Sequence, residues 1–232
     1  MAAGASGGKT FLKGLLGFSV LPWASFVVGF VSLTVATRVF PPAELGRITM
    51  FTAYGTLLAS VCYLGLDQAF VRFYHEPPSS RTQRYLFTTC LLPAVLVFVA
   101  FSGIVLVFWQ CVSILLVGEP DFFIAVCLCV YAFATLIVRF LNVLYRVQNN
   151  PKWYTIQGLF VSVSSTTVYL LAGFFSASHR PAILLMTVST MVWAMVFIVV
   201  QRKNLDVRPN RPDKQYVKTL AGFALPLVPI AI

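Results

Sequence analysis

The sequence predicts an all-α, polytopic membrane protein: a six-transmembrane-helix bundle followed by the start of a seventh helix. Three observations carry this prediction. Hydrophobic residues make up 59% of the chain and charged residues only 10%, whereas a soluble domain carries about 25% charged residues. Apolar runs of about 20 residues, the length that crosses a bilayer, recur along the chain. Basic residues gather in alternate connections between these runs, as they do in membrane proteins.

Six apolar runs are long enough to span. They cover roughly residues 18–37, 48–72, 86–109, 122–145, 154–175 and 183–200. The first is preceded by small and polar residues with Lys9 and Lys13, and its length indicates an uncleaved helix rather than a signal peptide. A seventh run begins at residue 220 and reaches residue 232, which gives about 20 Å of helix and does not cross a membrane.

These runs predict three segments: a six-helix transmembrane lobe over residues 1–200, a basic cytoplasmic linker over 201–219, and the truncated start of a second lobe over 220–232. Two short stretches support a second lobe. "KGLLGFSVLP" (13–22) and "KTLAGFALP" (218–226) share the pattern K-x-L-x-G-F followed by a proline. Chance recurrence of a short apolar motif is the alternative. A parallel repeat would be typical of transporters.

Charge predicts the orientation. One set of connections holds thirteen basic residues: Lys9, Lys13, Arg72, Arg81, Arg84, Arg146, Lys152, Arg202, Lys203, Arg208, Arg211, Lys214 and Lys218. The opposite set holds three: Arg38, Arg47 and Arg180. The positive-inside rule then places the amino terminus in the cytoplasm. The net charge of +10 is thus explained by a membrane lipid surface, and nucleic acid is not an expected partner.

The five cysteines, at positions 62, 90, 111, 127 and 129, show no C-x-x-C pairing and no nearby histidine. They predict neither a metal site nor a disulfide framework. We expect no cofactor.

Polar residues form a stripe in the fourth predicted span. Tyr131, Thr135, Arg139, Asn142 and Arg146 are spaced by three or four residues, which keeps them on one helical face. The other faces are apolar. One polar face indicates a helix that lines a cavity. Arg146 alone could extend to the lipid headgroups instead.

Asp67 and Arg72 lie at the end of the second predicted span. In a continuous helix they are about 140° apart, so they do not face each other. An isolated charge at the bilayer centre costs about 2.5–3.5 kcal/mol on insertion scales. Asp67 therefore needs a partner on another helix, for which Arg139 and Arg38 are the candidates. Arg72 could also serve only as a stop-transfer anchor.

Arginines outnumber acids among the residues predicted to lie inside the membrane. A cavity with this balance attracts anions, and the planar fork of arginine suits phosphate oxygens. The predicted cavity residues are Arg38, Arg72, Arg139, Asn142 and Gln157, with Asp67 as a coupling residue or a structural ion pair. Tyr54 and Ser164 are further neutral candidates, although at least half of such residues serve helix packing.

The stretch "SLTVATRVFPPAELGRITMFTAYGTLLASVCYLGLDQAFVRFYHE" (32–76) resembles the first two helices of bacterial polysaccharide flippases. The family turn "tr.l.p.e.G" corresponds to Thr37, Arg38, Pro41, Glu44 and Gly46, and "lGld.a.vRf" to residues 64–73. "RFLNVLYRVQNNPKWYTIQG" (139–158) is similar to the junction of the family's fourth and fifth helices. "TLAGFALPLVPIAI" (219–232) is similar to the opening of its seventh helix.

This family is the polysaccharide (O-antigen, Wzx-type) flippases of the multidrug/oligosaccharidyl-lipid/polysaccharide (MOP) exporter superfamily. The resemblance implies two six-helix lobes around a central cavity, in the bacterial cytoplasmic (inner) membrane. It implies that undecaprenyl-pyrophosphate-linked oligosaccharide, an anionic lipid-linked substrate, moves to the outer leaflet by alternating access. Arg72 would lie near the cytoplasmic mouth. The sequence departs from the family because it lacks almost all of the second lobe, which leaves two alternatives: a fragment, or two copies that pair as a homodimer.

Other functions stay open at this point. A multidrug or lipid II exporter of the same superfamily is one, although exporters of cationic drugs favour acidic cavities. A membrane glycan polymerase or glycosyltransferase usually needs a large outer loop and acidic catalytic residues. Here the longest outer loop is short, although it carries Glu119 and Asp121. A non-transporting scaffold that binds glycan-assembly proteins is the last alternative. We expect a transporter and not an enzyme.

Overall fold

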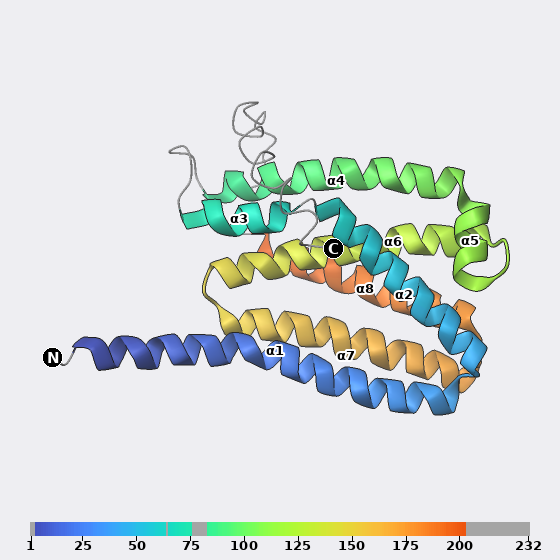
Figure 1. Cartoon of the computed structure of the whole chain (residues 1–232), viewed down its shortest axis with the longest axis horizontal. Helices are drawn as coiled ribbons and strands as arrows, with labels where there is room; N and C mark the ends of the chain where they lie inside the picture. Colours follow the sequence, from blue (N-terminus) through green and yellow to red (C-terminus); the bar gives the residue numbers. More distant parts are fainter. Residues whose placement is uncertain (1–2, 64, 76–82, 203–232) are drawn as a thin grey trace.

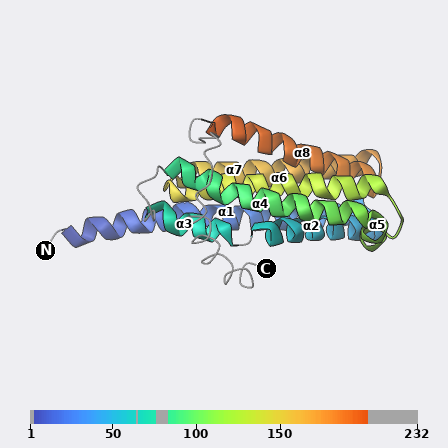
Figure 2. The ribbon, with the colours of Figure 1, turned by 90° about the horizontal axis from the view of Figure 1, so that it is seen from above.

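Long apolar segments separated by proline and glycine turns give a bundle of helices. A computed structural model describes residues 3–63, 65–75 and 83–202, which contain helices and no strand. The helices are α1 (Ala3–Val39), α2 (Pro42–Tyr63), α3 (Leu66–His75), α4 (Gln83–Val107), α5 (Trp109–Val117), α6 (Phe122–Val147), α7 (Pro151–Phe175) and α8 (His179–Gln201). The long helices run along a common axis, and α1 projects beyond the bundle at its amino-terminal end (Figures 1 and 2).

Five of these helices are long and apolar enough to span a membrane, or six if the bent pair α2–α3 is counted as one span. Counted in this way, the spans agree in number with the six that the sequence predicts. The run predicted over 48–72 is not one continuous helix, because α2 and α3 meet at an angle of 49°. Gly65 lies at this break with a φ of 67°, a conformation that glycine adopts without a Cβ clash.

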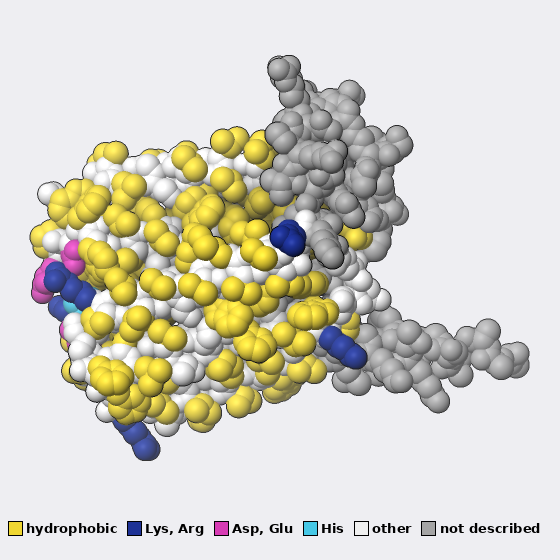
Figure 3. All heavy atoms as spheres, turned by 180° about the vertical axis from the view of Figure 1, so that it is seen from behind, with side chains coloured by type: hydrophobic (Ala, Val, Ile, Leu, Met, Phe, Trp, Pro, Cys, Tyr) yellow, Lys and Arg dark blue, Asp and Glu magenta, His cyan; other side chains and the backbone are white. Residues whose placement is uncertain are grey.

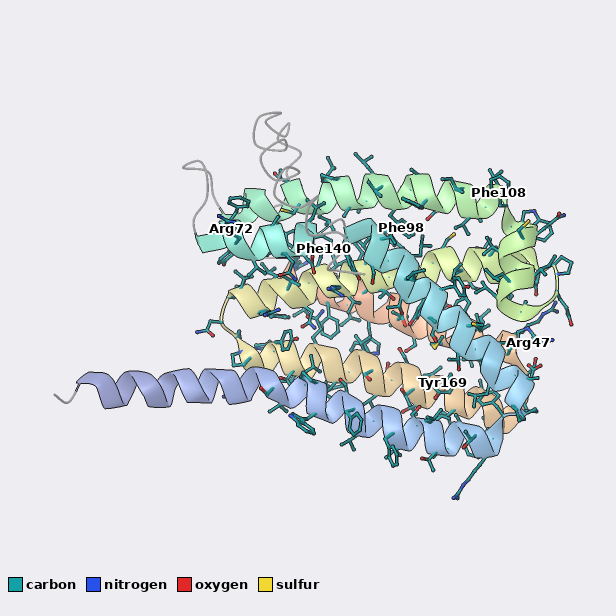
Figure 4. The ribbon with its side chains drawn as sticks, in the orientation of Figure 1. Arg47, Arg72, Phe98, Phe108, Phe140 and Tyr169 are labelled. Carbon is teal, nitrogen blue, oxygen red and sulfur yellow. The ribbon has the colours of Figure 1, made fainter. Side chains whose placement is uncertain are left out.

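The third predicted span is also divided. It continues through Phe108 into the short helix α5, so the connection to α6 is partly helical and not an extended loop. α5 ends at Val117. The next residue, Gly118, has a φ of 82°, and its N–H closes the last turn by donating to the Ile114 carbonyl. Figure 4 labels Phe108 at this corner.

α6 is the central helix of the bundle. Within its membrane window 61% of the residues are buried, against 33% or less in the windows of the other single-helix spans. One apolar cluster joins α6 to α2, α3, α4 and α8 around Phe70 and Phe140. A second joins it to α1, α2, α5, α7 and α8 around Phe51 and Ile183. Because α6 packs on both sides, its polar stripe faces the interior of the protein.

Large apolar side chains cover the flank of the bundle. Trp23, Phe26 and Phe30 of α1 are more than 60% exposed, as is Phe174 of α7. Figure 3 shows hydrophobic side chains across this flank and charged side chains at the two ends. A soluble protein rarely exposes apolar surface on this scale, whereas a lipid-facing surface requires it.

Glycines set the closest helix contacts. A Cβ at Gly173 of α7 would lie 2.5 Å from the ring of Phe40 and 2.6 Å from Val39, both at the end of α1. A Cβ at Gly55 of α2 would lie 2.5 Å from the ring of Tyr131 on α6. Small residues at such crossings let membrane helices pack closely. Gly55 in this way makes room for an aromatic side chain of the polar stripe.

The predicted linker over 201–219 and the predicted start of a second lobe over 220–232 lie, from residue 203 onward, outside the described residues. The repeat at 218–226 and the seventh helix therefore stay predictions.

Candidate functional site

Two adjacent hollows, each lined by both polar and apolar side chains, lie between the helices of the bundle. The first, which we name the charged hollow, has a volume of about 350 Å³ and lies between α2, α3, α6 and α7. Its polar lining consists of Thr56, Ser60, Tyr63, Asp67, Gln68, Thr135, Arg139, Asn142, Arg146 and Tyr154. Four members of the predicted α6 stripe are in this list. The helical spacing of the stripe places four of its five side chains along this hollow, whereas Tyr131 does not line it.

An ion pair between two helices crosses the charged hollow. The Arg139 guanidinium donates from Nη2 to Asp67 Oδ2 at 3.0 Å. The Asp67 side chain is only 3% exposed, whereas the Arg139 side chain is 43% exposed. Of the two partners that the sequence allowed for Asp67, packing selects Arg139. The break at Gly65 places Asp67 in the first turn of α3, where its Oδ1 also accepts the Gln68 N–H at 2.9 Å and the helix dipole favours a carboxylate.

The ring of Tyr63 also contacts the Arg139 guanidinium. The Arg139 Cζ lies 4.6 Å from the centroid of the Tyr63 ring, within the range of a cation–π contact. The Tyr63 hydroxyl in turn donates to the Thr135 carbonyl at 3.4 Å. A guanidinium carries five N–H donors. The carboxylate and the ring hold Arg139 in place, and its half-exposed side chain keeps donors directed at the hollow.

Asn142 adds an unused acceptor to the charged hollow. Its Oδ1 is buried and has no hydrogen-bond partner among the described residues. It lies three residues beyond Arg139, on the same face of α6. Arg146 follows four residues later, about 10 Å from Arg139 along the helix, and is exposed. The charged hollow thus presents a net positive charge from two arginines and one aspartate.

The expected single hollow shared by every predicted residue is not what the structure shows. Arg38 is exposed in the last turn of α1, at the opposite end of the bundle from the charged hollow. Arg72 is exposed on α3, where Figure 4 labels it. It is not among the residues that line the charged hollow. The predicted topology already assigned Arg38 and Arg72 to opposite sides, because a full span separates them. Whether either contacts a substrate stays a prediction.

Gln157 also lies outside the charged hollow. It is fully buried, donates from Nε2 to the Val138 carbonyl at 3.2 Å, and accepts from Gln201 Nε2 at 3.3 Å. These bonds join α6, α7 and α8. Ser164 likewise links α7 to α8 through Ser189 at 2.9 Å and through the indole N–H of Trp193. Both residues have the packing role that such residues commonly have in membrane helices.

The second hollow, which we name the hydroxyl hollow, has a volume of about 320 Å³ and shares Thr135 and Val138 with the first. Its polar lining consists of Thr52, Tyr131, Thr135, Ser162, Ser165, Thr166, Tyr169 and Thr190. Sequence reasoning missed the four that come from α7. Their positions follow the pattern i, i+3, i+4, i+7, which is one face of a helix. This pattern was the signal that could have found them.

A charged cluster joins the connections at the opposite end of the bundle. Glu44 Oε2 accepts from the backbone N–H of His179 at 2.6 Å and contacts its ring Nδ1 at 2.8 Å. Glu44 Oε1 pairs with Arg47 at 3.0 Å. Arg180 pairs with Asp121 at 2.8 Å. Opposite charges balance here, whereas the described connections at the other end carry mainly arginine and lysine. Figure 4 labels Arg47 in this region.

No group of three or more His, Cys, Asp or Glu side chains that could hold a metal ion occurs within residues 3–63, 65–75 and 83–202. The described cysteines are all free.

Apolar spanning helices around a hollow with a net positive charge are typical of one class of protein: a multi-pass membrane protein of the transporter, flippase type. The family follows from the comparison of sequences. The family model described as polysaccharide biosynthesis protein matches residues 11–229, and the chain belongs to this family, the flippases of the MOP superfamily. The family is transporter-like rather than enzymatic. No curated protein and no solved structure matches the chain.

Proposed function

We propose that this chain takes part in moving undecaprenyl-pyrophosphate-linked oligosaccharide across the bacterial cytoplasmic membrane, and that Arg139 receives the pyrophosphate. One observation carries the proposal. A guanidinium that is 43% exposed lies in an internal hollow of a membrane bundle, held on one side by Asp67. An arginine inside a membrane protein is costly and marks a pathway or a binding site.

The charge of the hollow favours an anionic ligand over a cationic one. Arg139 and Arg146 outnumber Asp67 within the charged hollow. Arginine binds phosphate oxygens through paired N–H donors. Cationic drugs, the cargo of some exporters of the same superfamily, would meet the same two positive charges. This balance supports a phosphate-bearing substrate rather than a cationic one.

Asp67 acts in this proposal as the partner that holds Arg139 while the site is empty. A pyrophosphate oxygen competes with the carboxylate for the same guanidinium, because both accept the same N–H donors. Arg146, exposed and about 10 Å from Arg139 along α6, would meet the phosphate first. The amino terminus and the connection between α6 and α7 then lie on the cytoplasmic side. A second lobe, or a second copy of the chain, would supply the facing wall.

The experiment measures binding of inorganic pyrophosphate to the purified chain in detergent. Arg139→Gln is combined with Asp67→Asn, so that no buried carboxylate is left without a partner. We expect the double variant to bind at least tenfold more weakly, because charge-assisted hydrogen bonds contribute about 1.5–3 kcal/mol. Asp67→Asn alone should bind as well as the unchanged chain or better, since a competitor is removed.

Arg180→Gln is the matched control, because Arg180 also pairs with an aspartate but lies at the opposite end of the bundle. It should leave pyrophosphate affinity unchanged. Equal affinity of the unchanged chain and the double variant would refute the role of Arg139. Equal losses in the double variant and in Arg180→Gln would show that only total charge matters.

A further inference from the structure

We propose that the hydroxyl hollow is a sugar-binding subsite, which takes the first sugar rings of the ligand whose phosphate lies on Arg139. This inference rests on the proposed function and assigns a role to residues of α7 that the charged hollow does not use.

The polar groups in the lining of the hydroxyl hollow are all hydroxyl groups; its other side chains, Val138, Val161 and Met186, are apolar, and none is charged. A cation would need carboxylate ligands, and an anion would need a positive charge or a cluster of N–H donors. A neutral ligand rich in hydroxyl groups fits instead, because each Ser, Thr or Tyr hydroxyl both donates and accepts. A sugar ring has this chemistry.

Four hydroxyl-bearing residues of α7 lie on one side of the helix and line the hydroxyl hollow, whereas Ser164 and Thr167 of the same helix do not. Its opposite side exposes large apolar residues such as Phe160, Val163 and Leu171, which suit lipid. A polar group without a partner in an apolar environment costs free energy. Hydroxyl groups on the inner face of α7 therefore need polar partners, either on neighbouring helices or in a ligand.

Some of these hydroxyl groups are fixed and others are unused. The Tyr169 hydroxyl bonds to Ser32 of α1 (Figure 4 labels Tyr169), and Ser165 bonds to Thr190 of α8 at 3.3 Å. Ser162 and Thr166 make no side-chain hydrogen bond among the described residues, and both are half-buried. Threonines in helices commonly bond back to the carbonyl four residues earlier, as Thr167 does at 2.8 Å. Thr166 does not, so its hydroxyl is free for a ligand.

The two hollows meet at Thr135 and Val138 of α6. Thr135 is one turn, about 6 Å, from Arg139 along the helix. A phosphate bound to Arg139 would therefore place the next covalent unit at the entrance of the hydroxyl hollow. Tyr131 forms part of its wall, and its ring is held against Phe51 at a centroid distance of 5.5 Å.

The test compares inorganic phosphate with a panel of hexose 1-phosphates: glucose, galactose, mannose and N-acetylglucosamine 1-phosphate. Binding is measured by calorimetry on the purified chain in detergent. We expect at least one sugar phosphate to bind about tenfold more tightly than phosphate, since two net hydrogen bonds of ordinary strength give a factor of this size. Ser162→Ala combined with Thr166→Val should remove this difference and leave phosphate affinity unchanged.

Thr167→Val is the matched control, because Thr167 lies next to Thr166 but is exposed on α7. It should preserve the preference for the sugar phosphate. If phosphate binds through Arg139 but no sugar phosphate binds more tightly, the sugar subsite is refuted and the proposed function stands. If Thr167→Val removes the preference for the sugar phosphate as well, the sugar-binding role of the hydroxyl hollow is likewise refuted. If Arg139→Gln with Asp67→Asn leaves phosphate affinity unchanged, the proposed function fails, and this subsite with it.

Discussion

Removing the guanidinium of Arg139 would leave the Asp67 carboxylate buried without its partner. Two unit charges 3.0 Å apart attract by about 5 kcal/mol at an effective dielectric constant of 20. Solvent reduces this value because the Arg139 side chain is 43% exposed. We therefore expect Arg139→Ala to lower the free energy of unfolding by about 3 kcal/mol, at the lower end of the range for broken buried pairs.

Removing the carboxylate instead should cost less. Asp67→Asn leaves a half-exposed guanidinium that water can solvate, and the amide oxygen can still accept a hydrogen bond. A loss of about 1 kcal/mol is expected, the size of one ordinary hydrogen bond. The asymmetry follows from burial, since Asp67 is 3% exposed and Arg139 is not.

The assay is equilibrium unfolding of the purified chain in mixed micelles with increasing SDS, followed by tryptophan fluorescence. Arg180→Ala is the control, because its pair with Asp121 is more exposed, with side chains 60% and 13% accessible; such pairs contribute about 0–1 kcal/mol. Equal losses for Arg139→Ala and Asp67→Asn would refute the argument from burial. So would a loss for Arg139→Ala no larger than that for Arg180→Ala.

Three further predictions concern packing and orientation. Gly173→Ala should lower the unfolding free energy by about 1–3 kcal/mol in the same assay, because the new Cβ meets a ring and a branched side chain at the end of α1. Gly29→Ala is the control and should be neutral or stabilising, since a Cβ there meets nothing within 4 Å. Equal losses of unfolding free energy in the two variants would contradict the packing of α1 on α7. Ser113→Ala should cost about 1–3 kcal/mol, since the buried hydroxyl donates to the Glu119 carbonyl and accepts the Asp121 N–H; an unchanged unfolding curve would contradict it. In a cysteine-free background, an impermeant maleimide added outside intact cells should label a cysteine at Gly118 and spare one at Gln148, and the reverse pattern would overturn the orientation.

The sequence limited the partner of Asp67 to two arginines but did not decide between them. Arg38 and Arg139 have the same charge and similar local surroundings, and helical spacing gives no information about which helices are neighbours. The alternation of spans does place Arg38 and Arg72 on opposite sides of the membrane, so these two arginines cannot contact the same ligand group. The contact with Arg139 also needed the break at Gly65, which turns α3 toward α6.

The charged cluster at the far end shows the same limit more strongly. Glu44 and His179 lie 135 positions apart, and no local pattern links them. They meet because α2 and α8 both begin at this end of the bundle. The roles of Gln157 and Ser164 were equally undecided, since a polar residue in a membrane helix can serve either a cavity or a neighbouring helix. In the structure, both side chains form hydrogen bonds to neighbouring helices.

By itself, the sequence determined the class of protein, the six spans and the polar face of α6, because the apolar length that crosses a bilayer and the helical period of side chains are local properties. The tertiary structure decided which polar residues share a hollow. It brought Asp67, Arg139 and Asn142 together and left Arg38 and Arg72 on the surface. It also placed four hydroxyl groups of α7 in a second hollow, next to the one that Arg139 lines. Neighbouring helices are chosen by the fit of their surfaces, at glycines such as Gly55 and Gly173, and that fit depends on residues far apart in the chain.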